Sequence, residues 1–73
     1  MDQQTHDRAL FESLSAIELD ALQGLVRGES IRGLAVRRLI TAEEAEEVRA
    51  SMRSKLGAAR DVDAVRIALT TGF

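Results

Sequence analysis

The chain has 73 residues, one histidine and no cysteine, with a formal net charge of −2. A single domain of this length buries only about 60% of its unfolded surface, so we expect contact with a partner or a second copy to add stability. Without cysteine, and with His6 alone in a polar stretch, no disulfide, metal ion or other cofactor is expected. No apolar segment approaches the roughly 20 residues that cross a bilayer, which predicts a cytoplasmic chain without membrane contact.

The charges are unevenly distributed along the chain. Residues 1–30 carry six carboxylates and two arginines, whereas residues 31–60 carry seven cations and four glutamates. Nine of the ten cations are arginine, whose planar guanidinium suits paired contacts with phosphate or carboxylate. A GC-rich genome would also favour arginine, so both explanations of this bias stay open.

The composition predicts an all-α fold. Proline is absent and glycine is scarce, while alanine, leucine, arginine and glutamate dominate, as in helices joined by short turns. Residues 1–13 are predicted to be an N-terminal extension, partly disordered or forming a short helix. Residues 14–73 are predicted to form the domain itself.

The first helix of the domain is predicted from Ser15 to about Arg27. Ser15 is a good N-cap, Glu18 can complete a capping box with it, and Gly28 can end the helix. Its inward face is expected to consist of Leu14, Ala21, Leu22, Leu25 and Val26.

A second, shorter helix is predicted to begin after Ser30, which can act as its N-cap. Gly33 near its start costs about 1 kcal/mol relative to alanine, so this helix depends on packing. The expected inward positions are Ile31, Leu34, Ala35 and Leu39, and the expected outward cations are Arg32, Arg37 and Arg38.

The clearest helix in the sequence is residues 42–56. Thr41 and Glu44 form a predicted capping box at its start, and Gly57 ends it in a left-handed conformation. The expected inward stripe is Ala45, Val48, Met52 and Leu56. The expected outward residues are Glu43, Glu46, Glu47, Arg49, Ala50 and Arg53.

The last helix is predicted to run from an Asp61 N-cap through residues 61–71 to Gly72. Its apolar residues are too many for one narrow stripe, so one flank is a candidate pairing surface. We expect Val62, Val65 and Leu69 to contribute to that surface.

Two helices joined by a tight turn, the second with a polar outer face, have the organisation of a helix-turn-helix. The order of capping, turn and apolar residues along the chain resembles that of the LuxR-type helix-turn-helix domain, most closely its FixJ-like branch. The matching residues are Leu14, Ser15, Glu18, Leu22, Gly28, Ser30, Leu34, Ala35, Ile40, Thr41, residues 55–58 and residues 63–69. The resemblance implies four helices, the third reading the major groove of DNA and the fourth making a dimer.

The helix 42–56 also departs from that family. Glu44 stands where the family usually has a threonine that touches phosphate, and Val48 replaces the usual histidine. Ala45 replaces a valine, and Glu47 replaces a small or apolar residue. Earlier in the chain, Gly33 stands for a glutamate and Arg38 for a leucine, whereas Glu46, Arg49 and Ala50 match the FixJ-like pattern.

One hypothesis is therefore a small transcriptional regulator that binds double-stranded DNA through helix 42–56 and dimerises through helix 61–71. Arg49 is expected to face base edges together with Glu46 and Ala50. The cations expected to hold phosphates are Arg32, Arg37, Arg38, Arg53 and Lys55. Four acidic side chains should weaken binding by repelling the duplex: Glu43, Glu44, Glu46 and Glu47.

The alternative hypothesis is a helix-turn-helix scaffold that has lost DNA binding and acts on proteins. Its acidic helix would imitate DNA charge, or an exposed Ile17 and Leu19 patch would dock on a regulator or an RNA polymerase subunit. Leu10 and Phe11 could instead fold back and cover that patch. Serine, histidine and aspartate are widely separated, so no enzyme activity is expected. The initial methionine without a preceding sensor domain favours a stand-alone regulator, although a piece of a larger protein would read the same.

Overall fold

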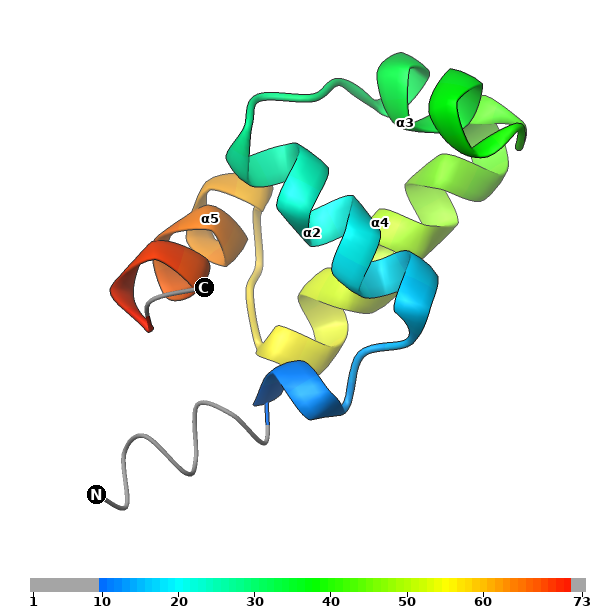
Figure 1. Cartoon of the computed structure of the whole chain (residues 1–73). Helices are drawn as coiled ribbons and strands as arrows, with labels where there is room; N and C mark the ends of the chain where they lie inside the picture. The colour runs from blue at the N-terminus through cyan, green and yellow to red at the C-terminus, as the bar shows by residue number, and fades with distance from the viewer. Residues whose placement is uncertain (1–9, 72–73) are drawn as a thin grey trace.

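The computed structural model describes residues 10–71, and all regular structure within them is helical. After a helical segment at residues 10–12 come four helices, α2 (Ala16–Val26), α3 (Ile31–Arg38), α4 (Ala42–Leu56) and α5 (Asp61–Thr70). The longest of these helices, α4, runs behind α2, while α3 lies beside the start of α4 and α5 packs against α2 (Figure 1). The all-α prediction is confirmed. Gly72, the predicted end of the last helix, lies outside the described residues.

Three helices begin where local side chains satisfy free backbone amides. Ser15 accepts from the Glu18 amide while the Glu18 carboxylate accepts from the Ser15 amide, and Thr41 and Glu44 form the same reciprocal pair. Ser30 accepts from the amide of Gly33 at the start of α3. All three predicted N-caps are confirmed because each depends only on residues three apart in the sequence.

The predicted N-cap of α5 is wrong by one residue. Arg60 is the N-cap, and its backbone amide donates to the carboxylate of Asp63 at 3.2 Å. Asp61 is the first helical residue, and its side chain binds Arg49 and Arg53 of α4. The carboxylate of Asp61, which the sequence predicted to cap α5, therefore forms long-range ion pairs instead.

Three helices end in the same left-handed turn. Gly28, Leu39 and Gly57 have positive φ angles of 88°, 58° and 72°. In each turn the next amide reaches back five residues, as from Ile40 to the carbonyl of Ala35 at 2.9 Å. Glycine adopts this conformation freely, whereas leucine pays a steric cost on the order of 1 kcal/mol.

Leu39 was expected to point inward, and that expectation is wrong. The side chain is 91% exposed because the left-handed backbone turns it away from the core. Ile40, the following residue, packs on the core in its place.

The core has two parts that follow the length of α4. The larger part joins α2, the second half of α4 and α5 through Leu22, Met52, Leu56, Ala64 and Ala68. The smaller part joins α2, α3 and the first half of α4 through Ala21, Leu34, Ala35 and Ala45. Alanines at three of these four positions let the helices approach closely, and α3 packs chiefly on the start of α4. Among residues 10–71, no helix is long and apolar enough to cross a membrane.

Candidate functional site

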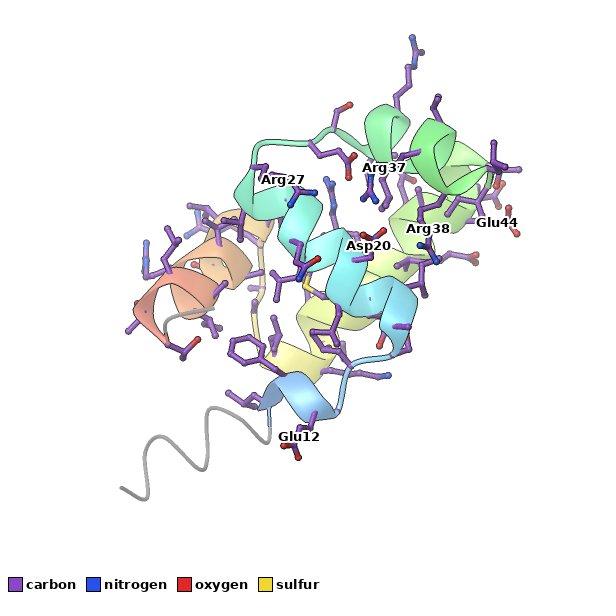
Figure 2. The ribbon with its side chains drawn as sticks, viewed as in Figure 1. Glu12, Asp20, Arg27, Arg37, Arg38 and Glu44 are labelled. Carbon is purple, nitrogen blue, oxygen red and sulfur yellow. The ribbon has the colours of Figure 1, made fainter. Side chains whose placement is uncertain are left out.

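The first two turns of α4 present an acidic surface. Glu43, Glu46 and Glu47 are exposed, and none of them pairs with a cation within residues 10–71. Glu44 is also exposed, but its carboxylate accepts from the Thr41 backbone amide at 2.9 Å, which lowers its pKa (Figure 2). Ala50 lies one turn further along, and it too is exposed.

Arg49 does not lie on this outer surface, so the prediction that it faces outward is wrong. Its side chain is only 5% exposed. Nη2 donates to the backbone carbonyl of Glu29 at 2.9 Å, and Nη1 lies 3.4 Å from Oδ2 of Asp61. The buried Nε has no hydrogen-bond partner. Arg49 thus connects α4 to the turn before α3 and to the start of α5.

An open hollow of about 390 Å³ lies beside Arg49. Its lining residues are Ile31, Glu46, Arg49, Ala50, Arg53 and Asp61. On the hollow's wall the Asp61 carboxylate bridges two arginines, since Arg53 Nη1 lies 2.5 Å from its Oδ1. The side chains of Arg53 and Asp61 are 28% and 41% exposed, so solvent reaches this bridge.

Arg37 and Arg38 both contact a carboxylate of α2, although their side chains remain 37% and 41% exposed. Arg37 binds both carboxylate oxygens of Asp20, at 2.8 and 2.9 Å, and both of Glu29, at 2.8 and 2.9 Å (Figure 2). The hydrogen bonds to Glu29, and to a smaller extent those to Asp20, raise the pKa of Arg37. The hydrogen bonds from Arg37 in turn lower the pKa of Glu29. Arg38 lies 3.6 Å from the same Asp20.

Gly24 makes this arrangement sterically feasible. A methyl group at position 24 would overlap the carboxylate of Glu29, which lies against the backbone of α2. In this position Glu29 accepts hydrogen bonds from Arg37 through its carboxylate and from Arg49 through its backbone carbonyl.

Lys55 is bound at the other end of α4. Its Nζ donates to Oε1 of Glu18 at 2.8 Å, and Ser51 Oγ donates to the other carboxylate oxygen at 2.6 Å. Burial by itself would raise the pKa of Glu18, but hydrogen bonds from Lys55, Ser51 and Ser15 outweigh it and lower that pKa to about 2.

Five of the six cations predicted to bind DNA are therefore already bound to carboxylates of the chain itself. The exception is Arg32, which is exposed and forms no ion pair with any residue between 10 and 71.

No protein-family model, curated protein or solved structure matches the chain. In the described part of the chain, no cluster of His, Cys, Asp or Glu could hold a metal ion.

The residues predicted to bind proteins fall into two groups. Val62 and Leu69 on α5 are 51% and 65% exposed, and Val65 between them is half-buried. Ile17 and Leu19 are both half-buried, so they form no fully exposed patch, and Leu19 packs on the same core cluster as Leu10 and Phe11.

The sequence reasoning missed an exposed apolar pair at the end of α3, Val36 and Leu39, which are 69% and 91% exposed. The exposure of Val36 agrees with the predicted inward face, which did not include position 36. The exposure of Leu39 could not be predicted, because nothing in the sequence indicates that this leucine adopts a left-handed conformation.

Proposed function

We propose that the chain is a helix-turn-helix module of the LuxR type that binds DNA through α4. The observation that carries this proposal is the unit formed by α3 and α4. Three residues, 39–41, connect the two helices, and α3 packs on the inner face of α4 and leaves the outer face uncovered. A helix presented in this way can enter the major groove while the preceding helix supports it.

In this proposal the residues at the groove are those that α4 exposes. Glu46 and Ala50 face base edges, where a glutamate can accept from the amino group of cytosine. Arg49 acts indirectly, because it is buried and positions α4 against the turn at Glu29. Arg32 and Arg53 contact phosphates from either side.

The affinity of this module for DNA is expected to be low. Each unpaired glutamate within a Debye length of the duplex, about 8–10 Å, reduces what the arginines gain by releasing counterions. A direct test is a titration of labelled random duplex DNA at low and moderate salt. We expect binding that weakens steeply as salt rises.

A matched pair of charge variants makes the test specific. Glu47→Gln removes one unpaired carboxylate from the outer face of α4, and Glu12→Gln removes one from the N-terminal segment (Figure 2). We expect Glu47→Gln to tighten binding severalfold and Glu12→Gln to change it much less. Equal effects would mean that net charge alone, and not α4, sets the affinity.

The acidic outer face of α4 favours a second candidate, a module that binds a basic protein surface. Three unpaired glutamates on two helical turns resemble a row of phosphates in charge. If wild type and Glu47→Gln both fail to bind duplex DNA at low salt, the DNA proposal is wrong and this candidate replaces it.

A further inference from the structure

The Asp61 carboxylate contacts two arginines of α4 on the wall of an open hollow beside the proposed DNA-binding face. A carboxylate and a phosphate bind guanidinium groups in the same bidentate or bridging manner. We propose that Asp61 occupies, in the free chain, the position that a DNA phosphate takes in the complex, so that DNA must displace it from Arg53. This inference rests on the proposed function, and it adds that Asp61 of the chain competes with a DNA phosphate for Arg53.

The geometry separates the two arginines by role. Arg49 is held by the Glu29 carbonyl at 2.9 Å, so its Nη1 stays directed at the same point whether or not Asp61 is there. Arg53 is 28% exposed and has Asp61 as its partner, so its guanidinium can turn to a phosphate without breaking any other bond described for it. The structure thus contains one fixed and one mobile donor around a single anion.

The carboxylate itself can leave. Its side chain is 41% exposed, and it is not used to cap α5, because Asp63 fills that role with the Arg60 amide. An ion pair as exposed as that of Arg53 and Asp61 contributes only about 0.2–1 kcal/mol. Displacing Asp61 therefore lowers DNA affinity without preventing binding.

The test compares two neutralised aspartates on the same turn of α5. Asp61→Asn and Asp63→Asn change the net charge equally, but Asp63 pairs with Arg60 and does not line the hollow. We expect Asp61→Asn to raise affinity for duplex DNA roughly fivefold to tenfold, and Asp63→Asn to raise it no more than about twofold. Helical circular dichroism and thermal unfolding establish that each variant is folded.

Arg53→Gln gives a second measurement in which Asp61 is intact. If Arg53 transfers to a phosphate, this variant should reduce the slope of log affinity against log salt by about 0.9. In the Asp61→Asn background it should also abolish the gain in affinity. The salt slope of the single Arg53→Gln variant does not depend on whether Asp61→Asn is stably folded.

The outcomes separate this inference from the function on which it rests. Equal gains from Asp61→Asn and Asp63→Asn, or an unchanged salt slope in Arg53→Gln, overturn the role of Asp61 while wild-type DNA binding stands. Absence of binding by wild type and by Asp61→Asn at low salt overturns both.

Discussion

Glu18 and Arg49 are the two charged side chains buried in the described part of the chain, and their surroundings differ. Glu18 lies between α2 and the last turns of α4, where both carboxylate oxygens accept hydrogen bonds. Arg49 lies between the middle of α4, the turn before α3 and the start of α5, and its Nε lacks a partner. A fully bonded charge fixes two helices in one arrangement, whereas a buried donor without a partner offsets part of the stabilisation that the other bonds of its side chain provide.

The largest expected effect comes from removing the fully bonded charge. Glu18→Ala removes the carboxylate half of the α2 capping box and leaves Ser51 and Lys55 without their acceptor, so we expect a loss of roughly 3 kcal/mol in the free energy of unfolding. Lys55→Ala should cost less than about 1 kcal/mol, because the lysine side chain is 41% exposed. Urea unfolding of both variants checks this, and similar losses would mean that Glu18 has no special role.

Acid should remove the same contribution. Because folding lowers the pKa of Glu18 from 4.5 to about 2, its contribution is complete above the unfolded pKa and disappears as the pH falls toward the folded one. The difference in unfolding free energy between wild type and Glu18→Gln should be roughly 2–3 kcal/mol larger at pH 7 than at pH 2. The exposed Glu12→Gln serves as control, and a difference that does not change with pH would contradict the explanation.

Replacing the incompletely bonded charge should cost less. Arg49→Met keeps much of the side-chain volume and removes the unpartnered Nε, so we expect a loss of about 1–2 kcal/mol from the freed Glu29 carbonyl and Asp61. Arg49→Ala, which also leaves a cavity, should cost clearly more. If Arg49→Met is as harmful as Glu18→Ala in urea unfolding, the distinction between the two buried charges does not hold.

The smallest effect concerns the left-handed turn after α3. Leu39→Gly should stabilise the chain by about 1 kcal/mol, raising the midpoint of thermal unfolding by several degrees, because the exposed side chain contributes little packing. Gly57→Ala, at a matching turn with open space for a methyl group, should destabilise by a similar amount. Calorimetry of both variants should give opposite signs.

The helix boundaries could be predicted because their signals are local. Capping boxes and turn glycines act within five residues, so Ser15, Thr41 and Gly57 were assigned correctly from the sequence. The α5 cap was missed because Asp61 binds arginines 8 and 12 residues away. Local rules contain no information about such partners.

The burial of Arg49 was missed for a related reason. Positions 45, 49, 52 and 56 have the spacing of one helical stripe, but a charged residue was assigned to solvent by type. Its burial becomes favourable only because the Glu29 carbonyl and Asp61 lie opposite it, and both come from other elements. The candidate site was predicted less well than the fold because its ion pairs are long-range.

The bare backbone of Gly24 has a consequence for how this sequence can change over evolutionary time. A side chain at position 24 and a glutamate at position 29 compete for the same space. Natural relatives with a larger residue at 24 should therefore carry a shorter residue at 29, and their arginine at 37 should change along with it. A larger residue at 24 with glutamate kept at 29 is therefore expected to be rare, whereas a shorter residue at 29 causes no overlap with Gly24.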